Sequence, residues 1–377
     1  MICVVRIRVE SEEPGLGVVA RRVDTGSRAF STPRRSVTLT ASGPSEALAS
    51  LSPDCWGLVE LYRELTRDGL RLIDRSGNRQ RAFAEQLIRR INALPAAHQV
   101  VLLVLSLQDK GYCPRGPEAQ YLADLAAAPF VQLTVVPRVM PKDTDEFLSY
   151  LADFLDGFST SNGPALMGYI PNFAYREIPK VLNRYLRAGV HMFVMEYNGA
   201  HAMALYPSFL AIRRSLIKDV GDEWYIHGLN VGPGAFRHSE TVCPSRDFLC
   251  LISGLDSIGA KHLVRRMPPE VWAKLTQKGG TGDRVFNRGD YGYYRPSKLR
   301  SLLGGSDPGN ITLGSLVRER SAHTVRLYNT ERQGLEAAAI RARLQRGRLT
   351  EYLRAKTQLG EDLERVRQVM RQATLKI

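Results

Sequence analysis

Acidic side chains follow four short apolar runs of the sequence. Each acid stands where its run stops: Asp74 after Leu70–Ile73, Asp109 just beyond Val100–Leu107, Glu196 after Met192–Met195, and Asp256 after Ile252–Leu255. Paired carboxylates perform nucleophilic and acid/base work at a sugar carbon, where the transition state is cationic. They equally suit a divalent metal ion. The sequence therefore predicts a carboxylate site if the runs are strands whose ends meet, and it leaves the two chemistries open.

Amide, aromatic and glycine residues accompany the acids at the ends of neighbouring runs. They are Tyr169 and Asn172, Asn198 and Gly199, and Asn230 and Gly232. Amides can hydrogen-bond the edge of a base, and aromatic rings can stack on its face. A single polar residue at such a position is more often solvated, because loops carry polar residues anyway. The convergence of several such residues is what indicates a site.

Short apolar runs alternate with longer amphipathic segments through the middle of the chain. Runs at 100–105, 130–136, 165–170, 192–196 and 224–231 precede helical patterns such as 117–127, 144–158, 175–188 and 208–218. Continuous apolar runs are expected for parallel strands buried on both faces. With Ser36–Thr40 or a strand near Trp56–Leu61 as the first, the pattern predicts an α/β fold, a (β/α)8 TIM-like barrel. Catalytic residues then belong at the carboxyl ends of the strands.

The two ends of the chain have a different character. Val4–Val9 alternates apolar with basic residues and can pair with Gly17–Val23, whereas the chain from about Thr330 is helical and rich in arginine. We therefore expect an N-terminal β-rich segment (1–34), a catalytic barrel (35–313) and a basic C-terminal helical extension (314–377). The arginines of the extension either form ion pairs along helix faces or contact phosphates, and the sequence favours neither.

The overall charge favours a polyanionic partner. The 377 residues carry a formal charge of +14, and nucleic acid is the first candidate for such an excess, the alternative being an Arg-rich protein from a GC-rich genome. The five scattered cysteines show no paired spacing, which argues against a disulfide framework or a structural zinc site. We find neither a signal peptide nor an apolar run that could span a bilayer, and we expect a cytoplasmic protein without membrane contact. The sequence contains no glycine-rich phosphate-binding motif, which argues against a nucleotide cofactor.

A series of short motifs follows in order along the chain. They are Asp24–Arg28 with Thr32-Pro33, Gly168–Asn172 with Arg176, Glu196–Gly199, His227–Gly232, Gly254–Ser257, Asn287–Tyr293, and Tyr328-Asn329 with Arg341, Gly347 and Tyr352-Leu353. In this order they resemble the tRNA-guanine transglycosylase superfamily, whose members exchange guanine for a 7-deazaguanine within a nucleic acid. The resemblance covers most of the chain, and it rests on the order of the motifs, since each one is degenerate.

The departures from that family point to one of its branches. No cysteine follows Cys250, so the family's Cys-x-Cys-x-x-Cys…His zinc site is expected to be absent. The Asp-Ser-Gly-Gly-Phe-Gln signature and the Gln-Gly-Gly element are not intact, and we do not expect the extra RNA-binding domain of archaeal tRNA enzymes. The chain looks most similar to the divergent DNA-modifying (DpdA-type) transglycosylases.

The resemblance implies a mechanism and a set of residues. Asp256 would attack C1′ of the sugar and expel guanine, and Asp74 or Asp109 would be the second carboxylate. The replacing base would be a 7-deazaguanine such as preQ0, and DNA is favoured over tRNA. Base recognition would fall to Glu196, Asn198, Gly199, Tyr169, Asn172, Asn230 and Gly232, and phosphate contacts to Arg288, Arg295, Lys298, Arg300, Arg341 and Arg348. No cofactor is expected, whereas helper proteins or a homodimer are possible partners. The alternative is a non-catalytic nucleic-acid-binding subunit on a decayed transglycosylase barrel.

Overall fold

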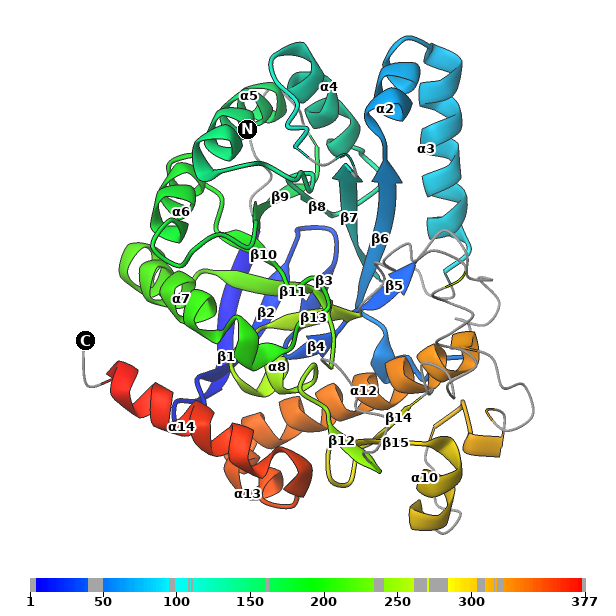
Figure 1. Cartoon of the computed structure of the whole chain (residues 1–377), viewed down its shortest axis with the longest axis vertical. Helices are drawn as coiled ribbons and strands as arrows, with labels where there is room; N and C mark the ends of the chain where they lie inside the picture. The colour runs from blue at the N-terminus through cyan, green and yellow to red at the C-terminus, as the bar shows by residue number, and fades with distance from the viewer. Residues whose placement is uncertain are drawn as a thin grey trace.

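A computed structural model describes residues 5–39, 50–94, 99–107, 109, 111–159, 163–233, 241–260, 270, 284–303, 309–314, 316 and 322–374. Within these ranges the chain forms an α/β barrel with an antiparallel sheet at its N-terminal end and helices at its C-terminal end (Figure 1). No helix of these ranges is long and apolar enough to cross a membrane.

The barrel is a parallel sheet of nine described strands. Along the sheet they run in the order β4 (Arg34–Arg35), β13 (Ser257–Ala260), β11 (Tyr225–Val231), β10 (Met192–Glu196), β9 (Ala165–Ile170), β8 (Leu133–Val135), β7 (Val100–Leu107), β6 (Leu58–Leu65) and β5 (Val37–Leu39). Most of their side chains are buried, as expected where helices cover one face of a sheet and the barrel interior the other. The predicted TIM-like barrel is confirmed.

The two outer strands of this sheet, β4 and β5, nearly close the barrel. They are consecutive in the chain, and only Ser36 separates them. The Ser36 N–H donates to the Ile258 carbonyl of β13 at 2.9 Å, and Val37 pairs with Val59 of β6. One extended segment, residues 34–39, therefore joins β13 on one side to β6 on the other. Both stretches that we considered as the first barrel strand contain a strand. The first corresponds to β4–β5 and the second to β6.

Helices follow most of the strands and cover the outside of the barrel (Figure 1). They are α2 (Arg67–Asp74), α3 (Gly77–Asn92), α4 (Pro117–Ala126), α5 (Thr144–Ser159), α6 (Ile178–Arg187), α7 (Tyr206–Val220) and α8 (Leu249–Ile252), with short 3-10 turns η1 (Pro53–Cys55) and η2 (Ala202–Ala204). Pro117 occupies the first turn of α4, where its missing N–H has no helical partner to lose.

An antiparallel sheet covers the amino end of the barrel. It consists of β1 (Arg6–Glu13), β2 (Val18–Asp24) and β3 (Ala29–Ser31), and β1 pairs with β2 as predicted. Phe30 of β3 packs edge-on against Tyr225 at the start of β11, with ring centroids 5.7 Å apart. The sheet thus lies where the barrel strands begin, away from the ends at which catalytic groups collect.

The C-terminal region packs against the first barrel strand. A second antiparallel sheet, β12 (Val242–Pro244), β15 (Gly292–Tyr294) and β14 (Val285–Asn287), adjoins α10 (Pro296–Leu303) and the long helix α12 (Ala322–Gln345). The chain ends in α13 (Leu349–Leu353), η3 (Thr357–Leu359) and α14 (Gly360–Thr374). Arg35 of β4 donates to Gln333 of α12 at 2.9 Å, which ties this helix to the barrel wall.

Two apolar runs that we expected to be strands are not strands. Leu70–Ile73 lies in α2, whose N-terminus is capped by the Thr66 hydroxyl accepting from Gly69 N at 3.0 Å. Of the run Ile252–Leu255, Ile252 ends α8, and Gly254 then turns the chain at φ +108°. Consequently Asp256 precedes strand β13 and does not follow a strand. This one shift moves Asp256 from the carboxyl end of the barrel to the amino end.

Candidate functional site

A buried ion pair stands at the carboxyl end of the barrel. Glu196 is the last residue of β10, and Arg138 continues the pairing of β8 with β7 beyond Val135. The Arg138 Nε lies 2.9 Å from Glu196 Oε2, and both side chains are at least nine-tenths buried. Burial by itself lowers the pKa of Arg138, but the neighbouring Tyr169 and Glu196 outweigh it and raise that pKa. The guanidinium therefore stays charged opposite the carboxylate.

Polar groups from neighbouring strands and strand ends surround this pair, and we call the set Ser106, Arg138, Glu196, Asn198 and Asn230 the mouth cluster. Arg138 donates through Nη1 to Ser106 Oγ at 3.2 Å and through Nη2 to Asn198 Oδ1 at 3.0 Å. The second oxygen of Glu196, Oε1, accepts from Asn198 N at 2.7 Å and from Asn230 Nδ2 at 3.3 Å. The carboxylate is thereby held in one orientation.

The backbone at the ends of β10 and β11 is built for close approach. Asn198 and Asn230 both have positive φ values, +50° and +61°, a region that asparagine tolerates better than most residues. Gly199 N donates to the Asn230 carbonyl at 2.7 Å, and a Cβ on Gly232 would fall 2.4 Å from the Gly199 carbonyl oxygen. Both predicted glycines therefore act through the backbone, bringing the two strand ends together.

Two tyrosines and a glutamate complete the mouth. Tyr62 and Tyr169 are buried on the barrel strands β6 and β9. Burial raises the pKa of Tyr169, and the Glu196 charge adds to this effect. Burial likewise raises the pKa of Tyr62, to which both Glu64 and Glu196 contribute by their charge. Glu64 pairs in register with Ser106 of the mouth cluster and is exposed. A second carboxylate, that of Glu64, is thus exposed on the strand next to the mouth cluster.

The structure brings together most of the predicted base-recognition residues. Glu196, Asn198, Asn230 and the two glycines meet as described, and Tyr169 adjoins Arg138. Asn172 is exposed in the segment after β9 and takes no part in these contacts. Sequence reasoning gave no role to Arg138, Tyr62, Glu64 or Ser106. The signal was present in Leu58–Leu65, where Glu60, Tyr62 and Glu64 recur at every second position.

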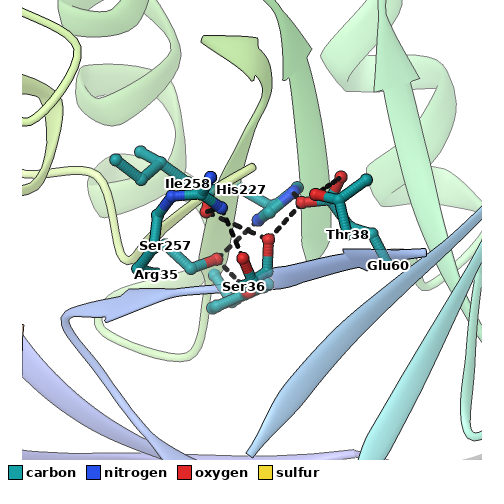
Figure 2. Close-up of polar contacts among 8 residues, drawn as sticks. Arg35, Ser36, Thr38, Glu60, His227, Ser257 and Ile258 are labelled. Atoms are coloured by element: carbon teal, nitrogen blue, oxygen red, sulfur yellow. Dashed lines mark hydrogen bonds and ion pairs between the residues drawn. The ribbon is translucent and has the colours of Figure 1, made fainter. Parts of the chain in front are cut away.

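A second polar cluster fills the interior of the barrel, and Figure 2 shows its side chains converging from several strands. His227 of β11 lies between Glu60 and Ser257, with Nε2 2.9 Å from Glu60 Oε1 and Nδ1 2.6 Å from Ser257 Oγ. Ser36 and Thr38 contact the same Glu60 carboxylate. Gly259 leaves room for it, because a Cβ there would fall 1.9 Å from Oε1. Glu60, His227 and Ser257 are fully buried, so this Ser–His–Glu arrangement is part of the packed core.

Asp256 occupies a closed position at the amino end. Its Oδ1 lies 2.6 Å from Arg21 Nη1 of β2, and its Oδ2 accepts from Ile226 N at 2.8 Å. The Arg21 guanidinium stacks on the Trp224 ring, 3.8 Å from the centroid. Burial raises the pKa of Asp256, and Arg21 offsets part of that effect. The expectation that Asp256 faces a substrate at the carboxyl rim is wrong, because it joins the N-terminal sheet to the bottom of the barrel.

The two candidates for the second carboxylate lie outside the mouth cluster. Asp74 is exposed at the C-terminal end of α2, so its expected place behind a strand is wrong. Asp109 does follow β7, as predicted. Its Oδ2 accepts from Arg67 N, the first residue of α2, at 2.6 Å. Asp109 therefore stabilises the start of a helix at the rim.

The predicted phosphate-binding residues divide into two groups. Arg288 pairs with the buried Glu336 at 2.9 Å, and Arg341 donates to the Pro33 carbonyl at 2.7 Å, so both guanidinium groups are engaged within the protein. Arg295, Lys298, Arg300 and Arg348 are exposed. Arg300 belongs to α10 and Arg348 immediately precedes α13.

No set of three or more His, Cys, Asp or Glu side chains in the described ranges is arranged to hold a metal ion. Cys55, Cys113, Cys243 and Cys250 are buried. Burial raises the pKa of the Cys55 and Cys113 thiols to about 12, which leaves both unreactive near neutral pH.

Comparisons with known proteins concern the fold alone. No protein-family model matches the chain, and no curated protein matches its sequence. The carboxyl transferase domain of Rhizobium etli pyruvate carboxylase is similar in structure, with 12% identity and a TM-score of 0.40, over 86% of this chain and 56% of that one. A GH113 β-mannanase from Alicyclobacillus acidocaldarius has 12% identity and a TM-score of 0.38, over 62% and 89%. This chain thus spans little more than half of the first of these structures.

Proposed function

We propose that this protein is a base-exchanging transglycosylase that replaces guanine in nucleic acid, DNA favoured over tRNA, by a 7-deazaguanine. The observation that carries the proposal is the Arg138–Glu196 pair, a carboxylate fixed at the carboxyl end of a barrel among amide groups. Chemistry in barrels of this kind is performed at that end. The proposal moves the reacting carboxylate from Asp256 to Glu196.

The reaction needs two carboxyl groups with different roles. Glu196 attacks C1′ of the sugar; the bond from C1′ to the guanine nitrogen breaks while a bond to the carboxylate oxygen forms. Glu64, exposed beside Tyr62, donates a proton to the departing guanine. The incoming base then gives a proton to Glu64 and displaces Glu196 from C1′. Atoms and charges balance, because one base leaves and another takes its place.

The surroundings of Glu196 suit a cationic transition state. Its two oxygens are oriented by Arg138, Asn198 and Asn230, so little reorganisation is needed when positive charge develops at the sugar. A base within a duplex must first leave the stack to reach such a site. The net charge of +14 and the exposed basic side chains of α10 attract the phosphate backbone of nucleic acid.

A non-catalytic nucleic-acid-binding subunit is the second candidate. One observation favours it: Asp256, the acid that the family resemblance assigns to nucleophilic attack, is enclosed in an ion pair with Arg21. Such a subunit would retain the basic surface and the barrel and would not exchange bases.

The test is incorporation of radiolabelled guanine. The purified protein is incubated with labelled guanine and separate pools of DNA and tRNA, and the label retained in each pool is counted. The proposal predicts label in DNA and its loss when Glu196 is changed to Gln. Binding of DNA without any incorporation would support the subunit instead.

A further inference from the structure

Asn198 is the exposed member of the mouth cluster, and its amide has a defined orientation. A guanidinium can only donate hydrogen bonds. The atom of Asn198 that faces Arg138 Nη2, 3.0 Å away, must therefore be the carbonyl oxygen Oδ1. The amide nitrogen Nδ2 points elsewhere, and no partner for it is found among the residues that the structure describes.

The backbone of Asn198 adds a second restraint. Its N–H donates to Glu196 Oε1 at 2.7 Å, and its φ of +50° places the residue in the left-handed region. The side chain of Asn198 thus contacts Arg138, and its backbone N–H contacts Glu196. The NH2 group is a donor on a residue whose backbone N–H contacts the carboxylate that reacts in the proposed function.

We infer that Asn198 is a specificity-determining residue that selects a base carrying a hydrogen-bond acceptor, such as a ring carbonyl, and rejects one carrying an amino group there. The inference rests on the proposed function and adds to it that the base must present an acceptor, not a donor, to Asn198. If the ligand also presents a donor at this point, the donor of the protein remains without a hydrogen bond. Such mismatches discriminate strongly between similar ligands.

The substitution Asn198→Asp inverts the polarity with little change in shape. An aspartate still accepts from Arg138 and tolerates positive φ, but it presents an acceptor where the amide presented a donor. Asn198→Gly is the matched control, because it removes the side chain without straining the backbone. Melting temperatures of both variants verify that the fold is retained.

The experiment measures binding of guanine, which has a ring carbonyl, and of 2,6-diaminopurine, which has an amino group in its place. We expect the wild type to favour guanine by about tenfold or more, Asn198→Asp to reverse the preference, and Asn198→Gly to bind both with similar affinity. An unchanged ratio in Asn198→Asp would overturn the inference, as would wild-type protein that binds neither base. The proposed function fails separately, by absence of label in nucleic acid, so the two failures are distinguishable.

Discussion

The barrel holds two buried arginine–carboxylate pairs, one at each end, and they differ in what surrounds them. Arg21–Asp256 at the amino end is covered by the N-terminal sheet and stacked on Trp224. Arg138–Glu196 at the carboxyl end is bordered by the exposed Asn198 and Glu64. Burial alone therefore does not distinguish the two pairs. The solvent exposure of their neighbouring residues does.

The sharpest way to break this comparison is to remove the carboxylate of the amino-end pair. Asp256→Ala leaves Arg21 charged and unpaired in the core, and we expect the free energy of unfolding to fall by about 3–5 kcal/mol. Urea denaturation measures it. Asp74→Ala, which removes an exposed carboxylate, is the control and should change stability by less than about 0.5 kcal/mol. A small effect at Asp256 would show that the pair does not hold the N-terminal sheet in place.

The interior cluster offers a second, smaller test. Gly259→Ala places a Cβ against the Glu60 carboxylate, which must move away from His227, and we expect a loss of about 1–3 kcal/mol. Thermal unfolding of the variant measures this loss. Gly77→Ala is the matched control, because open space surrounds its position at the start of α3, and it should be neutral or slightly stabilising. Equal stabilities would mean that the barrel interior is not tightly packed at Glu60.

The exposed basic residues should contribute the smallest effects. Arg300→Ala and Arg348→Ala each remove one exposed charge. If each contacts one phosphate, the slope of log affinity against log salt should fall by about 0.9 per residue. Titration of DNA binding at several salt concentrations measures the slope. Arg288→Ala should instead reduce stability, because it removes one of the two basic partners of the buried Glu336. Unchanged slopes for both exposed variants would exclude them from the interface.

Sequence patterns predicted much of the barrel because its strands are fully buried. Met192–Glu196 coincides with β10, and Ala165–Ile170 with β9. Short apolar runs next to helix signals were misread, since such runs do not distinguish a strand from a buried helical turn. Thr66 and Asp68 before Leu70–Ile73 are the start of a helix, and Gly254 is a turn.

The candidate site was predictable in part. Residues at or just beyond the end of a correctly predicted strand, such as Glu196, Asn198 and Asn230, meet at the mouth. Asp256 was misplaced because a single strand boundary decides whether it follows a strand or precedes one. In the structure the strand begins after it, at Ser257. Which acid pairs with which arginine depends on contacts across the barrel, such as Glu196 with Arg138, and no local pattern encodes these.

The most direct test of the central claim compares two isosteric variants in the base-exchange assay. Glu196→Gln and Asp256→Asn are assayed for labelled guanine incorporation, each normalised to the folded fraction measured by circular dichroism. We expect Glu196→Gln to lose at least about 10³-fold in rate, as for the loss of a nucleophile, and Asp256→Asn to stay within about fivefold of the wild type, as for a residue remote from the reacting atoms. The reverse result, activity retained without Glu196 and abolished without Asp256, would contradict the assignment of the carboxyl-end mouth as the active site.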